Sequence, residues 1–283
     1  MSRLASTLTW PLGLVALIVY LWVSAPPLLP EEGAGDSAAL VPVEVVFRIL
    51  AGENDTARGL YTRKIVGDGL KQGLAFDEDW REEDVVAGPL PALFLRATSE
   101  RLVRVGSPIR LFLGSDQPIV ASNLFEGEQA RRFAAIRKTR QPELFFDASS
   151  GRHTAMFPDV AVAEACVTCH NEHPDSPKVD WAVGDVMGAT TWTLPKAGYT
   201  REEVLGMVES FRGASAATYD EYLEEYATAD ADAIVPVVGQ GWPEDGLAVP
   251  DTAEFMGTCA AKASAATLAH LMSPMASTRP SEN

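Results

Sequence analysis

Apolar side chains recur at helical spacing in the segment that begins at Val43. One stripe contains Val43, Val46, Phe47, Leu50, Ala57, Tyr61 and Ile65. A repeat of three and four residues places such positions on one face of a helix, so the pattern predicts a long amphipathic helix. Asn54 lies on the same stripe, where a polar side chain is either hydrogen-bonded in the core or faces a cavity.

The next hundred or so residues change between helical and extended patterns. A proline-initiated helix is predicted within Val86–Leu102 and another within Glu126–Lys138. The predicted strands are "IRLFLGS", "ELFFD", "RHTAMFPDV" and the Thr-, Val- and Trp-rich "WAVGDVMGATTWTL". Helices that lead into several antiparallel strands indicate an α+β domain, which we place at residues 43–195.

After Pro195 the pattern becomes helical. Thr200 and Glu203 form a capping box, and apolar and tyrosine side chains then mark one face of a long helix. A final Ala-rich helix carries Cys259, which is interpreted as a buried thiol. Residues 196–283 are therefore predicted to be a helical C-terminal extension, and its helices suggest pairing into a homodimer.

The first 30 residues contain a long uncharged segment. No side chain from Leu4 to Pro30 is charged, and "LGLVALIVYLWV" is almost wholly apolar. Arg3 precedes this segment and two glutamates follow it, which places the amino terminus in the cytoplasm. Residues 1–30 are predicted to be a transmembrane anchor or a cleaved signal, and residues 31–42 a linker. The rest of a single-pass inner-membrane protein would then lie in the periplasm.

Net charge narrows the class of partner. The 283 residues carry 23 basic and 39 acidic side chains, which gives a net charge of −16. Such a surface repels phosphate backbones, so nucleic acid is not expected as a partner. An acidic surface could instead dock a basic redox protein.

Two of the three cysteines lie in one motif, Cys166-Val-Thr-Cys169-His170. This is the spacing of a c-type haem attachment site. Two thiols separated by two residues can form thioethers with the two vinyl groups of one porphyrin, and the adjacent imidazole becomes the proximal iron ligand. The predicted cofactor is one covalent haem c.

Three other interpretations of the motif remain open. A redox-active pair of cysteines would need a thioredoxin-like βαβ context. A zinc site would take Cys166, Cys169, His170 and His173 as ligands. A structural disulfide would leave His170 without a role.

Beyond the motif itself, "AMFPDVAVAEACVTCHNEHPDSPKVDWAVGDVMGATTW" resembles a family of bacterial extracytoplasmic c-type-haem domains with a PAS-like fold. The blocks "ARGLYTRKIVGDGLKQGLAFDEDWRE", "AGPLPALFLR" and "LFLGSDQPI" are similar to the same family. Its members are sensor modules in front of histidine kinases and chemotaxis-type transducers, or stand-alone haem proteins. The resemblance covers about residues 43–195. It implies a PAS-like antiparallel sheet, thioethers at Cys166 and Cys169, and His170 as proximal ligand.

The resemblance leaves the sixth iron ligand unassigned. Some members use a cysteine or a methionine from the amino-terminal helix, and residues 43–70 contain neither. Met156 is the first distal candidate because a thioether is a normal haem ligand. His153 and His173 are alternatives, and an open or water-filled position is another.

Further side chains are predicted to surround the haem. Arg58 and Tyr61 lie on the helix expected to cover the pocket, where they could donate hydrogen bonds to a distal ligand or the propionates. Trp181 is expected to pack against the porphyrin. A basic concentration, interpreted as a solvated helix face or as propionate partners, comprises Arg131, Arg132, Arg137, Lys138 and Arg140.

Two classes of function follow from these expectations. In the first, the protein is a redox-sensing or small-ligand-sensing haem module, with a diatomic molecule as ligand, that acts through a partner protein. In the second, it is an electron carrier tethered to the membrane. No enzyme activity is predicted, although a peroxidase-like activity, which would need a distal acid–base pair, stays open.

Overall fold

The computed structural model describes residues 40–227, 234–239, 242 and 247–272. The described residues from Leu40 to Met272 belong to one compact unit. The predicted anchor, residues 1–30, lies outside the described residues. Within the described part of the chain, no helix is both long and apolar enough to cross a bilayer.

The predicted amphipathic helix is confirmed. Helix α2 (Val43–Leu60) continues through a π-helical segment, η1 (Tyr61–Val66), into α3 (Gly67–Lys71). All seven apolar residues of the predicted stripe are buried, at 5% exposure or less. A π-helical turn inside an α-helix often marks a functional site, and this one begins three residues after Arg58.

The main sheet has four antiparallel strands, all of them in segments predicted to be extended. They are β4 (Arg110–Gly114), β5 (Glu143–Asp147), β6 (Arg152–Val160) and β7 (Val186–Leu194), in the spatial order β4-β7-β6-β5. The mixed class of helices and antiparallel sheet agrees with the sequence analysis. The two-residue strands are β1 (Val41–Pro42), β2 (Phe76–Asp77), β3 (Gly88–Pro89), β8 (Gly198–Tyr199), β9 (Val237–Val238) and β10 (Ala248–Val249).

One end of the sheet contains a β-bulge. Asp159 pairs with Gly188 and Val160 pairs with Val186, so Met187 is an extra residue on β7. Gly188 is needed here because a Cβ atom would lie 2.5 Å from the carbonyl oxygen of Gly114. The bulge lies where β6 leaves the sheet and leads to the CxxCH motif.

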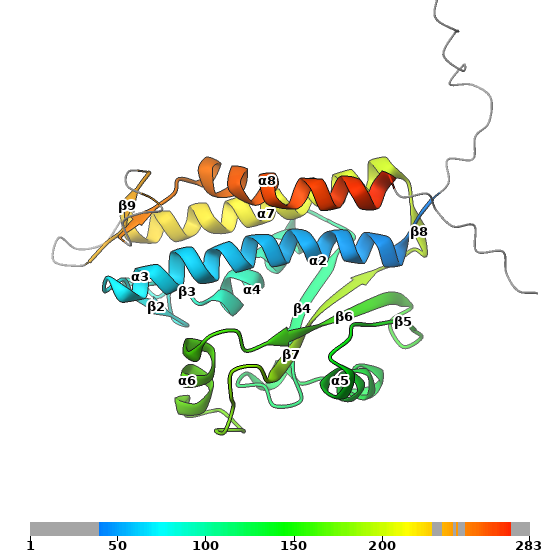
Figure 1. Ribbon diagram of the computed structural model, residues 1–283, viewed down its shortest axis with the longest axis horizontal. Helices are drawn as coiled ribbons and strands as arrows, with labels where there is room; N and C mark the ends of the chain where they lie inside the picture. Colours follow the sequence, from blue (N-terminus) through cyan, green and yellow to red (C-terminus); the bar gives the residue numbers. More distant parts are fainter. Residues whose placement is uncertain (1–39, 228–233, 240–241, 243–246, 273–283) are drawn as a thin grey trace, which may run out of the picture. The chain divides into compact units, whose positions relative to one another are not determined.

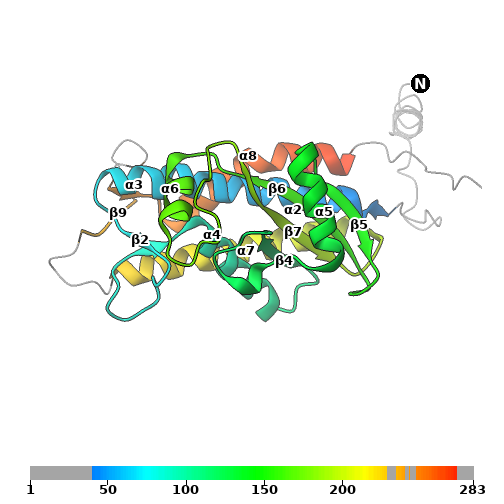
Figure 2. The same ribbon diagram turned by 90° about the horizontal axis from the view of Figure 1, so that it is seen from below.

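Helices cover both faces of this sheet (Figure 1). One face packs against α2, α4 (Pro91–Arg104) and α7 (Arg201–Ala227), and α5 (Gly127–Thr139) packs against the other. Helix α8 (Thr252–Met272) packs on α2 and α7. Seen from below, α5 and the motif helix α6 (Glu164–Glu172) are both in view, with α6 at the α3 end of the unit (Figure 2). A short 3₁₀ helix, η2 (Ala121–Asn123), lies between β4 and α5.

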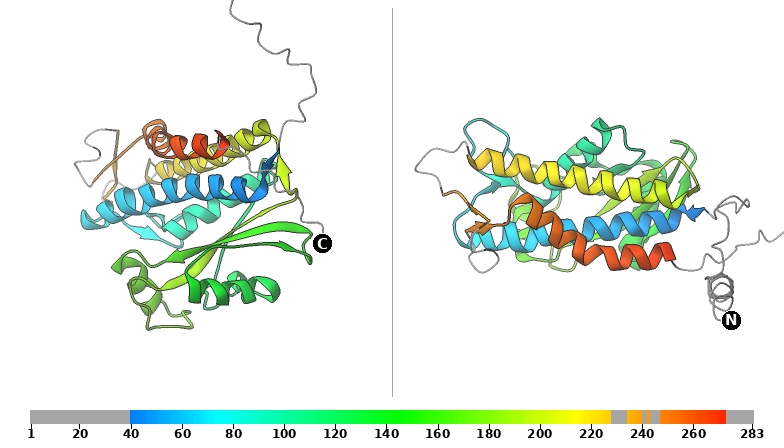
Figure 3. Two further views of the ribbon diagram at one scale, coloured as in Figure 1. Left: turned by 45° about the vertical axis from the view of Figure 1, so that its right-hand side comes forward. Right: turned by 90° about the horizontal axis from the view of Figure 1, so that it is seen from above.

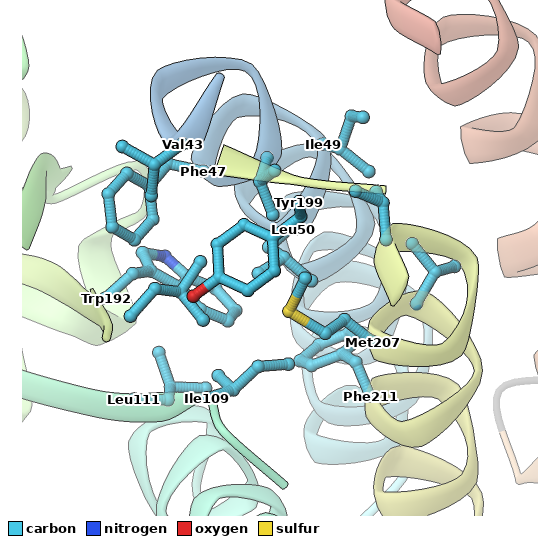
Figure 4. Close-up of a cluster of buried hydrophobic side chains, with 14 of the residues drawn as sticks. Val43, Phe47, Ile49, Leu50, Ile109, Leu111, Trp192, Tyr199, Met207 and Phe211 are labelled. Carbon is cyan, nitrogen blue, oxygen red and sulfur yellow. The ribbon is translucent and has the colours of Figure 1, made fainter. Parts of the chain in front are cut away.

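The C-terminal helices share the core of the sheet. Helices α2, α7 and α8 lie side by side (Figure 3). The largest cluster of buried side chains joins α2, α7 and the sheet, and Figure 4 shows it with Val43, Phe47, Ile49, Leu50, Ile109, Leu111, Trp192, Tyr199, Met207 and Phe211. Residues on the two sides of Pro195 therefore pack into one core, although the element type changes there.

The predicted start of α7 is confirmed by its capping box. The backbone N–H of Thr200 donates to Glu203 Oε2 at 2.8 Å, and the N–H of Glu203 donates to Thr200 Oγ1 at 3.1 Å. These two bonds satisfy donors that the first turn of a helix would otherwise leave free. The predicted inner face of this helix is buried at Val204, Val208, Phe211, Tyr219, Tyr222 and Tyr226.

Candidate functional site

The CxxCH motif lies on α6, a nine-residue helix that connects β6 with β7. Residues four apart share one helix face, so Cys166 and His170 lie on the same side and Cys169 lies next to them. Cys169 is exposed and Cys166 is partly buried, and neither is in a disulfide in the described residues. Two free thiols and an imidazole are thus displayed on one surface of a short helix.

The surroundings of His170 favour the neutral form of its imidazole, which is the form that binds a metal. The pKa of this imidazole lies below its ordinary value of 6.5. Burial is the main cause and His173 lowers the pKa further, whereas Asp159 opposes them by raising it. The ring is therefore neutral at neutral pH, as a histidine ligand must be. Its buried Nδ1 atom has no hydrogen-bond partner among the described residues.

Trp181 packs against this imidazole. The two rings meet edge to face, with their centroids 6.5 Å apart and an interplanar angle of 83°. The side chain of Asn171 fixes Trp181 by accepting from its backbone N–H at 2.8 Å and donating to its carbonyl at 3.0 Å. The ammonium of Lys178 lies 4.2 Å from the centre of the indole ring. The loop after the motif is thereby folded back onto α6, and Trp181 lies beside the predicted iron ligand.

Arg58 reaches the same region from α2. Its Nη1 lies 2.9 Å from Asp159 Oδ1, and its Nη2 donates to Asp159 Oδ2 at 3.0 Å. This bidentate pair joins α2 to the bulged end of β6. Burial lowers the pKa of the guanidinium, but Asp159, Asp55 and Cys166 raise it above its ordinary value. The Arg58 end of α2 is therefore joined to the strand that leads into the motif.

Tyr61, in contrast, is part of the core between helices. Its side chain is fully buried, its hydroxyl donates to the carbonyl of Pro89 at 2.7 Å, and its ring stacks on Phe94 with centroids 4.4 Å apart. Burial raises the pKa of this phenol well above 10. The structure does not bring Tyr61 to the motif, and its hydroxyl already has an acceptor.

Met156 lies on the other face of the sheet from Arg58. It is fully buried with Phe133 and Ile136 of α5, whereas its neighbour Ala155 belongs to the core under α2. Alternate residues of a strand face opposite sides, and Asp159 contacts Arg58 on the α2 side. The structure therefore separates Met156 from the region where Arg58 meets the motif.

The two alternative histidine ligands are held by local contacts. Both ring nitrogens of His173 have partners, since Nε2 lies 3.0 Å from Glu78 Oε1 and Nδ1 accepts from the backbone N–H of Asp175 at 3.1 Å. The ring of His153 packs edge to face on Phe146 at 5.1 Å. Neither imidazole is brought to His170 by a contact in the described residues.

The other chemical interpretations of the motif gain nothing from the structure. Strands β6 and β7 are antiparallel neighbours, so the helix between them is not part of a parallel, thioredoxin-like βαβ unit. No group of three or more His, Cys, Asp or Glu side chains in the described ranges is arranged to hold a metal ion such as zinc. The thiols of Cys166 and Cys169 are free.

Four of the five residues of the basic concentration around α5 have partners. Arg132 contacts Glu128 at 2.7 Å and Glu143 at 3.1 Å. Arg131 also pairs with Glu128, and Arg137 pairs with Asp116. The Nη2 of Arg140 donates to the carbonyl of Gly184 at 2.7 Å. These contacts favour the interpretation as a solvated helix face.

Sequence reasoning missed Asp159 and Asn171 as parts of the site. Asn171 directly follows the motif, and this position could have identified it. Its two hydrogen bonds to Trp181 could not be predicted from the sequence. Asp159 is 101 residues from Arg58, and no local pattern reports a pair so distant in sequence.

Comparison with known families gives one match. Residues 115–195 match a family described as Tll0287-like (Tll0287), which is of the cytochrome or haem-sensor type. The matched range contains α5, β5, β6, α6 and β7, and so the whole CxxCH motif. No curated protein and no solved structure matches the chain.

Proposed function

We propose that this chain is a mono-haem c-type protein. Cys166 and Cys169 would hold the porphyrin through thioethers and His170 would be the proximal iron ligand. The observation that carries the proposal is the single surface of α6 on which two free thiols lie beside a neutral imidazole. The bound haem would supply an iron that changes oxidation state and takes up axial ligands.

The residues around the motif fit such a group. The neutral ring of His170 can coordinate iron, and its orphaned Nδ1 is a polar atom that the described residues leave unsatisfied. Trp181 provides an apolar ring beside it. The antiparallel sheet covered by helices on both faces supports a PAS-like fold for this domain, as does the match to a cytochrome or haem-sensor family.

The role that fits best is a sensing module for redox state or a small diatomic ligand, acting through a partner protein. Support comes from the family match and from residues 43–70, which contain no cysteine or methionine as sixth ligand. The uncharged segment in residues 1–30 supports a membrane-anchored domain in the periplasm. We propose no enzymatic activity.

An electron carrier is the second candidate, and one observation favours it. The thiol of Cys169 lies among carboxylates: partial desolvation raises its pKa, and Glu78, Asp77 and Glu172 raise it further. A haem edge attached at this position would carry a negative rim, which suits docking of a basic redox protein.

Production of the protein in a host with cytochrome maturation tests the proposal. Intact mass should show one added haem, and the Cys166→Ala/Cys169→Ala variant should lose it completely. Cys259→Ala is the matched control, because this thiol is buried on α8, and it should keep the haem. Wild-type protein without added tetrapyrrole would refute the proposal.

Absorption spectra of the same samples separate the two roles. Oxidised, reduced and CO-treated spectra report whether the iron has an open position. Spectral change on CO addition supports sensing of a small ligand. A six-coordinate iron that ignores CO supports the electron carrier.

A further inference from the structure

We infer that Arg58 and Asp159 are positioning residues that set the electron affinity of the haem attached at Cys166 and Cys169. The inference rests on the proposed function and adds a role for two residues outside the motif. Neither side chain is assigned as an iron ligand. They act through the charge that they place beside α6.

The geometry of the pair is specific. Two nitrogens of one guanidinium face two oxygens of one carboxylate, at 2.9 and 3.0 Å. Bidentate pairs of this kind fix orientation as well as distance. Asp159 lies at the β-bulge that ends the regular part of β6, seven residues before Cys166. The pair therefore joins the last turn of α2 to the segment that leads into α6.

The ion pair lies where β6 leads into α6. Arg58 is within electrostatic range of Cys166, and Asp159 is within electrostatic range of His170. The side chains of the pair are 22% and 23% exposed, so solvent screens them only in part. Carboxylates at Asp77, Glu78 and Glu172 act on Cys169, and the carboxylate of Asp55 lies near the Arg58–Asp159 pair. Arg58 supplies a positive charge in a negative neighbourhood.

The expected effects of the two charges on iron have opposite signs. Oxidised haem carries one positive charge more than reduced haem. The carboxylate of Asp159 therefore stabilises the oxidised form, and the guanidinium of Arg58 stabilises the reduced form. In the intact pair the two effects partly cancel. Removal of one partner leaves the other uncompensated.

The test is a set of reduction potentials for the holoprotein and its variants Arg58→Gln, Asp159→Asn and the double variant. Arg58→Gln should lower the potential and Asp159→Asn should raise it. Each should shift the ratio of oxidised to reduced protein at fixed potential by roughly threefold or more, the size of one unit charge acting across a partly exposed site. The double variant should lie between the single variants.

Arg131→Gln is the matched control. Arg131 also pairs with a carboxylate, Glu128, but it is 77% exposed and lies on α5, on the other face of the sheet. This variant should leave the potential unchanged. A purely structural role for the Arg58–Asp159 pair predicts shifts of the same sign in both single variants, and that result would overturn the inference.

Measurement of the haem content distinguishes a failure of the proposed function from a failure of the role inferred for the ion pair. Wild-type protein without covalent haem refutes the proposed function, whereas haem-loaded variants with identical potentials refute only the role of the pair. If Arg58→Gln does not accumulate as folded protein, Arg58→Lys decides, because it keeps the charge. The ratio of oxidised to reduced protein should then stay within about twofold of wild type, and a larger shift counts against the charge mechanism.

Discussion

Helix α2 carries two ion pairs five residues apart, and their surroundings differ. The carboxylate of Glu53 is almost fully buried and accepts from Arg212 Nε at 2.8 Å, Arg212 Nη2 at 2.7 Å and Thr267 Oγ1 at 2.8 Å. These bonds join α2 to α7 and α8. Arg58, at more than 20% exposure, contacts Asp159 at the end of the sheet beside the motif.

From this difference we expect the Glu53 contact to hold the fold and the Arg58 contact to act on the proposed haem site. Both oxygens of Glu53 are occupied, and an unpaired charge at its position would be costly because water cannot reach it. Arg58 uses two of the five N–H donors of a guanidinium on Asp159. The same helix thus contacts the C-terminal helices through Glu53 and the end of β6 through Arg58.

The largest effect on stability is expected for Arg212→Met. The substitution leaves the carboxylate of Glu53 buried without its cation, which should cost about 3 kcal/mol, the low end of the range for a broken buried pair. The low end applies because the side chain of Arg212 is 28% exposed. Urea unfolding of the haem-free protein measures the loss.

The double variant Glu53→Met/Arg212→Met is the control for this cost. Removal of both charges also removes the unpaired carboxylate, so much of the stability should return. A double variant as unstable as Arg212→Met would show that packing, and not the charge, accounts for the loss.

The thiol of Cys259 on α8 provides a second test of the buried region around Glu53 and Arg212. The pKa of this thiol is raised from 9.0 to about 11, mainly by burial. Glu53 contributes to the rise and Arg212 opposes it. In the Cys166→Ala/Cys169→Ala variant it is the only thiol. At pH 8 the smaller thiolate fraction alone should make its reaction with a thiol reagent about a hundredfold slower in the folded state than in urea. Equal rates in the two states would contradict the buried placement.

The same shift gives a direction for the pH dependence. A group whose folded pKa is raised favours folding fully below its unfolded value, and that contribution disappears as pH rises through the folded value. The contribution of Cys259 to the free energy of unfolding should therefore fall between pH 9 and about pH 11. Cys259→Ala should remove this part of the pH dependence.

Local pattern predicted most of the elements that surround the site. The stripe from Val43 to Ile65 gave α2, and "RHTAMFPDV" matches β6 residue for residue, because spacing along a helix or strand is a property of neighbouring residues. The capping box at Thr200 gave the start of α7 in the same way. The motif was also local, since Cys166 and His170 are four residues apart.

What the sequence did not predict depends on distant pairs. Arg58 was a candidate, but its partner Asp159 is set by where the bulged end of β6 meets α2. Tyr61 lies three residues further on and packs away from the motif, onto Phe94 of α4. Met156 was placed by the pairing of strands, which put it under α5. In each of these residues, the side of the helix or sheet on which the side chain lies determined whether it is near the motif.

Thr267→Val should have a smaller effect than loss of the arginine. The hydroxyl of Thr267 donates to Glu53 Oε1 at 2.8 Å, and the valine keeps the shape of the side chain without the donor. Because Arg212 still binds the carboxylate, the cost should be about 1 kcal/mol. Thr56→Val is the control: its hydroxyl bonds only the carbonyl of Gly52 in its own helix turn, and it should cost less than half as much.

The smallest effect on stability is expected for substitution of Arg58. The same substitution is expected to affect the haem more than substitution of Arg212 does. Arg58→Gln breaks a partly exposed ion pair, and such pairs contribute about 1 kcal/mol or less. Urea unfolding of the haem-free Arg58→Gln protein, in parallel with Arg212→Met, measures the contrast within one helix. If Arg58→Gln loses as much stability as Arg212→Met, both ion pairs hold the fold, and the proposed difference between the two pairs on α2 is wrong. A small loss, together with a lowered reduction potential in the haem-bound form, would mean that α2 holds the fold through Glu53 and acts on the iron through Arg58.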